Sequence, residues 1–131
     1  MESETNKILE RILKAKGKPY QHQLNTALAL EKCKSVILRA PTGSGKSEAV
    51  LAPFLALKGK IFPSQMIYSL PMRNLADQLF TRAEEARNNC QLSIKISCHH
   101  GEMRASVLFS KDLIFTTIDQ TVCAYACTPL L

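Results

Sequence analysis

The residues with the clearest chemical meaning form the stretch Ala40-Pro-Thr-Gly-Ser-Gly-Lys-Ser47. Gly43 and Gly45 let the backbone turn tightly and direct its N–H groups inward, toward the oxygens of an anion. Lys46 adds a positive charge on a long side chain, and Ser47 adds a hydroxyl of the kind that binds Mg²⁺. The order matches the Walker A phosphate loop, with Ala40 in place of the usual first glycine. The stretch therefore predicts a site for the phosphates of a nucleotide.

Each residue of this loop has an expected role. Lys46 is expected on the β and γ phosphates and Ser47 on Mg²⁺, which makes these two the candidate catalytic residues. Gln23, in "PYQHQ", precedes the loop by some 20 residues, and its amide can donate to and accept from an adenine edge. The full set of predicted ligands for ATP and Mg²⁺ is Gln23, Thr42, Gly43, Ser44, Gly45, Lys46 and Ser47.

The elements around the loop must bring it to the edge of a sheet. Ser35–Leu38 is a short apolar run that predicts a buried parallel strand leading into the loop. Further strands are predicted at 65–70, 92–98 and 112–117, with helices at 21–30, 47–57, 74–87 and 119–126. Strands that alternate with helices predict an α/β fold with a mainly parallel sheet flanked by helices. The candidate motifs then lie at the C-terminal ends of strands.

Composition limits the class of protein. The 131 residues carry a net charge of +6, which suits a polyanionic partner such as nucleic acid. The five cysteines form no CxxC pair, the first residues form no apolar export stretch, and no apolar run is long enough for a bilayer. We therefore expect a cytoplasmic chain without a membrane partner. Cys123 and Cys127 have the spacing of a metal-ligand pair, but buried structural cysteines are favoured because no second ligand pair is nearby.

Five segments read together carry a family resemblance: "PYQHQ", "APTGSGKSEAV", "SLPMRNLADQLFTRAEE", "HHGE" and "FTTIDQ". Their order and spacing resemble the first RecA-like lobe of superfamily 2 helicases and, more narrowly, the CRISPR-associated helicase family. Glu48 and the tetrapeptide Thr117–Gln120 are the most family-specific pieces. The resemblance implies a partial RecA-like P-loop lobe at 19–131. The residues before it, 1–18, are expected to form a helical extension, because an apolar stripe predicts an amphipathic helix at Glu4–Lys16.

The resemblance also assigns roles to residues beyond the phosphate loop. Gln23 corresponds to the glutamine that recognises adenine. The residues that correspond to positions contacting the backbone of single-stranded DNA are Arg73, Thr116, Thr117 and Gln120. Met72 replaces a threonine that family members often have, so Arg73 is expected to supply that phosphate contact. His99, His100 and Gly101 resemble a His-Gly loop after a strand, which we expect to be a surface loop near DNA rather than a metal site.

One family element has no counterpart in the sequence. Motif II supplies an Asp-Glu pair for Mg²⁺ and the attacking water. None of the three aspartates of this sequence, Asp77, Asp112 and Asp119, is followed by a glutamate. The motif II strand and the second lobe are expected beyond Leu131, so the chain alone is expected to lack ATP turnover.

The sequence thus predicts an N-terminal part of an ATP-dependent DNA helicase of CRISPR interference. Its expected partners are the remainder of the helicase or a CRISPR effector complex. Two other functions stay open. One is a small P-loop kinase, and the other is a non-catalytic split subunit or binding module, which the apolar ending "ACTPLL" favours.

Overall fold

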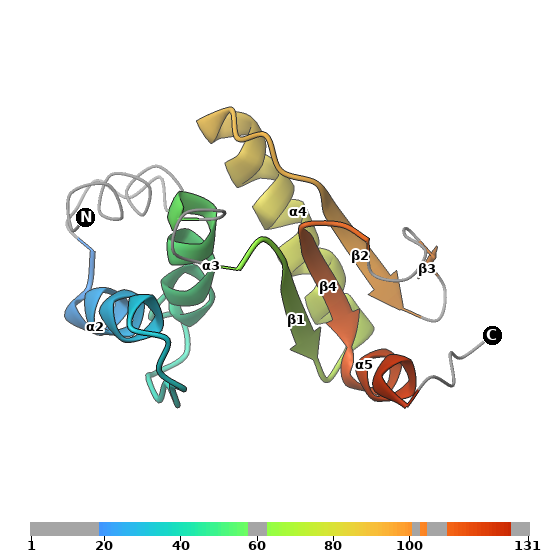
Figure 1. The fold of residues 1–131 in the computed structure, drawn as a ribbon, viewed down its shortest axis with the longest axis horizontal. Coiled ribbons are helices and arrows are strands. Elements are labelled where there is room, and N and C mark those ends of the chain that lie inside the picture. The colour runs from blue at the N-terminus through green and yellow to red at the C-terminus, as the bar shows by residue number, and fades with distance from the viewer. Residues whose placement is uncertain (1–18, 58–62, 101–102, 105–109, 127–131) are drawn as a thin grey trace. The chain divides into compact units, whose positions relative to one another are not determined.

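A computed structural model describes residues 19–57, 63–100, 103–104 and 110–126 (Figure 1). The chain divides into two compact units, Met1–Ser64 and Gln65–Leu131, which are described separately. The helix predicted at Glu4–Lys16 lies outside the described residues, so the domain boundary after residue 18 stays a prediction. Among the helices of the described ranges, none has the length and apolar character to span a membrane.

Two helices build the described part of the first unit, α2 (Gln21–Glu31) and α3 (Lys46–Leu57). They pack on each other. The buried apolar residues of these helices are Ala27, Ala49, Leu51, Ala52, Phe54 and Leu55. Both predicted helices are confirmed, and α3 begins at Lys46, one residue before the predicted start.

α2 ends in a left-handed residue that is not glycine. Cys33 has φ +54°, its N–H donates to Leu30 O at 2.9 Å, and the N–H of Lys34 donates to Ala29 O at 3.1 Å. These two bonds are those of a Schellman motif, which satisfies the last carbonyls of a helix. The chain then leaves α2 toward the phosphate loop.

The prediction of a strand at Ser35–Leu38 is wrong, because these residues have no regular secondary structure. Ile37 is 99% exposed and Val36 is 37% exposed. A strand persists only when its backbone groups pair with a neighbouring strand. Within the described ranges, the strands all belong to the second unit and pair among themselves.

The second unit contains a sheet of four strands in the order β1-β4-β2-β3. The strands are β1 (Met66–Leu70), β2 (Ile96–His100), β3 (Met103–Arg104) and β4 (Leu113–Thr117). β4 lies between β1 and β2 and runs parallel to both, whereas β3 pairs antiparallel with β2 (Figure 1). Every residue of β4 is buried, as expected for the centre of a parallel sheet. The predicted α/β class with a mainly parallel sheet is confirmed.

Helix α4 (Arg73–Cys90) covers one face of this sheet and contacts β1, β2 and β4. Its buried face consists of residues three or four positions apart, which is the period of an amphipathic helix: Ala76, Leu79, Ala83 and Ala86. The fully buried Cys98 of β2 donates its S–H to Asp77 Oδ1 at 3.5 Å. α4 also ends in a Schellman motif, because Gln91 has φ +51° and donates to Asn88 O.

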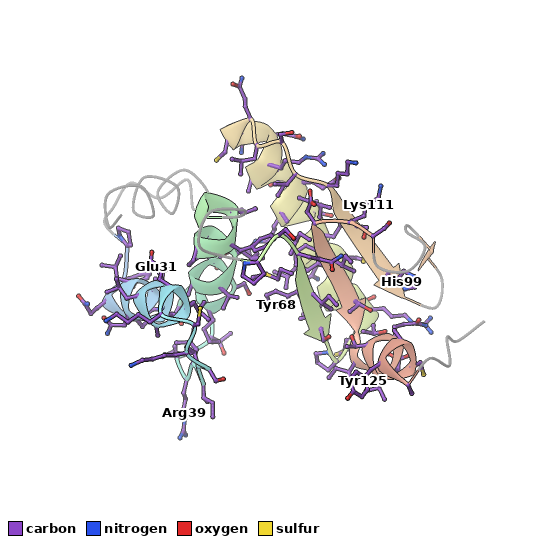
Figure 2. All side chains as sticks on the ribbon, in the orientation of Figure 1. Glu31, Arg39, Tyr68, His99, Lys111 and Tyr125 are labelled. Carbon is purple, nitrogen blue, oxygen red and sulfur yellow. The ribbon has the colours of Figure 1, made fainter. Side chains whose placement is uncertain are left out.

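Helix α5 (Ile118–Tyr125) follows β4 without a loop. Its contacts are with β4 and β1. Its apolar residues Ile118, Val122 and Tyr125 are 50%, 59% and 92% exposed, and Figure 2 labels Tyr125 on this helix. Cys123, which was expected to be buried, is only half-buried, while Cys127 lies outside the described residues.

Two predictions about β2 are corrected. The strand begins at Ile96 rather than Leu92, because the N–H of Leu92 completes the end of α4 by donating to Arg87 O. The N–H of Lys95 then donates to the Asp112 side chain at 2.8 Å, just before the ladder with β4 starts. His99 and His100 were predicted in a loop but belong to β2, where they pair with β3. Gly101 lies outside the described residues.

Candidate functional site

The phosphate loop has the backbone that its glycines predict. Gly43 has φ +79° and Gly45 has φ +75°, values that L side chains rarely adopt. The turn between them is closed by Ser44, whose N–H and hydroxyl both donate to Pro41 O, at 3.3 and 2.7 Å. The loop runs directly into α3, since Gly45 O accepts the N–H of Ala49 at 3.0 Å.

Lys46 and Ser47 open α3 and lie where the helix dipole favours an anion. The Lys46 ammonium donates to Ala40 O at 2.8 Å and to Pro41 O at 2.7 Å. Its charge is therefore held over the loop by carbonyl oxygens rather than by a carboxylate, and phosphate oxygens can replace these acceptors. Glu48 is 7% exposed and adds a carboxylate to the first turn of the helix.

The start of α2 contacts the loop at two successive carbonyls. His22 Nε2 lies 2.9 Å from Ser44 O, and Gln23 Nε2 donates to Gly45 O at 3.1 Å. We call these two bonds the α2–loop contact. The other end of the Gln23 amide accepts the N–H of Tyr20 at 2.9 Å, which gives the backbone donor of the N-cap residue of α2 a partner.

Gln23, the predicted adenine ligand, makes these bonds as a fully buried side chain. Its oxygen and its nitrogen each have a partner within the protein, although each also has capacity for a second bond. The involvement of His22 was missed by the sequence reasoning. The available signal was its place beside Gln23, but the contact joins residues far apart in sequence.

A second group of predicted site residues lies in the second unit, at the C-terminal ends of two neighbouring strands. β1 leads to Arg73 at the start of α4, β4 leads into α5, and the strand ends pair at Leu70 and Thr117. Arg73 is exposed, whereas Thr116, Thr117 and Gln120 are 0%, 4% and 6% exposed. Arg73 is thus the member of this group whose side chain is open to solvent.

Asp119 lies in the first turn of α5, and its pKa is shifted by neighbouring groups. The neighbouring Thr117 side chain lowers the pKa of Asp119 below its ordinary value of 3.8, and backbone N–H groups and the charge of Arg73 lower it further. Thr117 occupies the N-cap position of α5, but its side chain makes no capping bond to the backbone. The start of α5 therefore combines an ionised carboxylate with a nearby arginine charge.

In the part of the chain that the structure describes, no group of three His, Cys, Asp or Glu side chains could hold a metal ion.

Comparisons with known proteins agree on one kind of protein. The family model described as DEAD/DEAH box helicase matches residues 18–123. A CRISPR-associated helicase Cas3 from Thermoproteus tenax is 32% identical over 111 residues, which are 79% of this chain and 20% of that protein. A CRISPR-associated endonuclease/helicase Cas3 from Escherichia coli K12 is 33% identical over 73 residues, 56% of this chain and 8% of that protein. The chain thus spans a fifth or less of the length of these relatives.

A solved structure supports the fold. The DUF1998 helicase MrfA, in a crystal structure bound to DNA and AMPPNP, matches with a TM-score of 0.74 and 18% sequence identity. The match covers 92% of this chain and 18% of that one. This likeness confirms the predicted RecA-like α/β fold.

Proposed function

This chain belongs to the DEAD/DEAH box helicase family, and from that premise we propose that it binds ATP with Mg²⁺ and single-stranded DNA as part of a CRISPR-associated helicase. The observation that carries the nucleotide part is the loop at 40–47. Two glycines with positive φ, a lysine folded over the turn and a helix start meet there. That donor set fits the phosphate groups of a nucleotide.

The roles follow from these positions. Backbone N–H groups of the loop other than that of Ser44 donate to phosphate oxygens, and Lys46 exchanges its carbonyl acceptors for the β and γ phosphates. The Ser47 hydroxyl is placed at the start of α3 to bind Mg²⁺. Bound ATP supplies the phosphoryl bond whose cleavage drives such motors. Gln23 is proposed to contact adenine with the bonding capacity that its protein partners leave.

The DNA part rests on Arg73 and the start of α5. An exposed arginine at a helix start, beside backbone N–H groups at a second helix start, suits the phosphates of a single strand. Thr117 and Gln120 are proposed to support this surface from beneath, because both are largely buried. The buried Thr116 donates to Thr117 O at 3.4 Å, so its proposed contribution is to the strand end rather than to DNA directly.

The CRISPR assignment is supported by the two Cas3 relatives. Since no Asp-Glu pair occurs in the sequence, we propose that the remainder of the helicase supplies motif II. The proposed partner of these residues is that remainder or a CRISPR effector complex. The chain alone is then expected to bind Mg-ATP without turning it over.

Titration calorimetry with Mg-ATP tests the nucleotide site. Lys46→Ala is expected to abolish detectable binding, and Lys34→Ala, which changes an exposed lysine of the same unit, is the matched control. ATP hydrolysis is measured with and without single-stranded DNA. Binding by Lys46→Ala at the affinity of the unchanged chain would contradict the loop assignment, and turnover indifferent to DNA would favour a small P-loop kinase.

Fluorescence anisotropy with labelled single-stranded DNA tests the second surface. Arg73→Ala should weaken binding about equally for all sequences and make its dependence on salt shallower, because a phosphate contact is lost. Arg82→Ala, on an exposed position of the same helix, is the control. A loss confined to particular DNA sequences would argue against a phosphate contact.

A further inference from the structure

We propose that His22 is a positioning residue of the phosphate loop, which holds the Ser44 carbonyl so that the N–H of Gly45 faces the phosphates. The inference rests on the proposed nucleotide function, which assigns His22 no role. It is carried by the 2.9 Å separation of His22 Nε2 from Ser44 O. A carbonyl oxygen can only accept, so Nε2 must be the donor in this bond.

The bond acts on the loop through the geometry of the peptide unit. The structure has no cis peptide bonds in its described residues, and in a trans unit the C=O and the following N–H point in opposite directions. Holding Ser44 O against α2 therefore turns the Gly45 N–H away from α2. Gln23 holds Gly45 O and so turns the N–H of Lys46 in the same manner. The α2–loop contact thus fixes two consecutive N–H donors.

Glycine makes this restraint necessary. Gly45 has few steric limits on its backbone, so without outside bonds its peptide units would sample many orientations. Donors already aimed at an anion bind it without an ordering cost at the moment of binding. A side chain that restricts these units should therefore affect phosphate affinity.

The histidine ring is itself held in place. It stacks on the ring of Tyr20 with a centroid distance of 5.6 Å and an interplanar angle of 12°. Helix α2 has separate anchors in the buried Gln23, Thr26 and Ala27. Changing the side chain of His22 should therefore loosen the loop more than it destabilises the helix.

Two variants of nearly equal size separate the donor from the ring. His22→Gln keeps an N–H donor about as far from the backbone as Nε2, whereas His22→Met has the same length without a donor. Gln21→Met is the control, because Gln21 bonds to Asn25 rather than to the loop. Calorimetry on the whole chain uses Mg-ATP and, to remove the base, tripolyphosphate. Thermal unfolding reports stability in parallel.

His22→Met is expected to lower the affinity for Mg-ATP and for tripolyphosphate by the same factor. That factor is roughly five- to tenfold, the size expected for the loss of one hydrogen bond. His22→Gln should recover most of that loss, and Gln21→Met should bind like the unchanged chain. Equal affinities for His22→Met and His22→Gln would overturn the inference, since the donor would then be irrelevant. If the unchanged chain bound neither ligand, the proposed nucleotide function would fail, and this inference with it.

Discussion

The two loop glycines form a matched pair for a stability experiment. Gly43 and Gly45 have φ values of +79° and +75°, so replacing either by alanine imposes nearly the same backbone strain, about 1–2 kcal/mol. Their surroundings differ. A Cβ on Gly43 would meet nothing within 4 Å, whereas a Cβ on Gly45 would lie 2.5 Å from Gln23 Nε2.

The difference between the two variants follows from what Gln23 must give up. To avoid the new methyl group, its amide has to leave Gly45 O, and moving the amide also threatens the bond from Tyr20 N–H. Each hydrogen bond is worth about 0.5–1.5 kcal/mol net, and more if a buried partner is left unsatisfied. Gly45→Ala should therefore lower the unfolding free energy by about 1–3 kcal/mol more than Gly43→Ala does.

Urea denaturation measures both losses under identical conditions. The experiment is then repeated in a Gln23→Ala background, where no amide remains for the Cβ at position 45 to meet. The excess loss of Gly45→Ala over Gly43→Ala should largely disappear there, which is the signature of a direct coupling. Equal losses in the original background, or an excess that survives Gln23→Ala, would refute the reasoning.

Three further predictions concern other features. Gln91→Gly should raise the unfolding free energy by about 0.5–1 kcal/mol in urea denaturation, because glycine adopts the φ of +51° without strain; a lower value would contradict the assigned helix end. Alkylation at pH 8 followed by peptide mass spectrometry should modify the exposed Cys33 and spare Cys98 until denaturant is added, because burial and Asp77 raise the pKa of Cys98 to about 12. Comparable labelling of both would count against the packing of β2. Asp119→Asn should reduce the unfolding free energy at neutral pH but not in acid. The lowered pKa of Asp119 means that its carboxylate stabilises the folded chain at pH values above 3.8, its ordinary pKa, and that this stability is lost as the pH falls further. If the unfolding free energies of the variant and the unchanged chain differed equally at pH 7 and pH 2, this origin would be excluded.

Much of the fold could be predicted because the relevant signals are local. The apolar face of α4 repeats every three or four residues, and the run Leu113–Thr117 is apolar enough for a buried strand. The loop at 40–47 is equally local, because glycine, lysine and serine at fixed spacing carry their own backbone and chemical requirements. Patterns of this kind need no knowledge of what lies across the sheet.

The main errors came from contacts that the local sequence pattern does not show. Ser35–Leu38 has the composition of a strand, but pairing is decided by another strand. The start of β2 was misplaced because Leu92 is used by the end of α4 and Lys95 by Asp112. His22 contacts Ser44, 22 residues away in sequence, and its place beside Gln23 does not by itself predict that contact.

The sheet order has a consequence for how the second unit is made on the ribosome. Strand β4, which lies between β1 and β2, is the last of the four in the chain. Its residue Leu113 pairs with Met66 of β1 on one side and with Ile96 of β2 on the other. While only β1 and β2 have been synthesised, neither has its parallel neighbour, and their edges are open to unwanted association. The sheet can close only after Thr117 leaves the exit tunnel, and because β1 and β4 are far apart in sequence, this closure is a late and comparatively slow step.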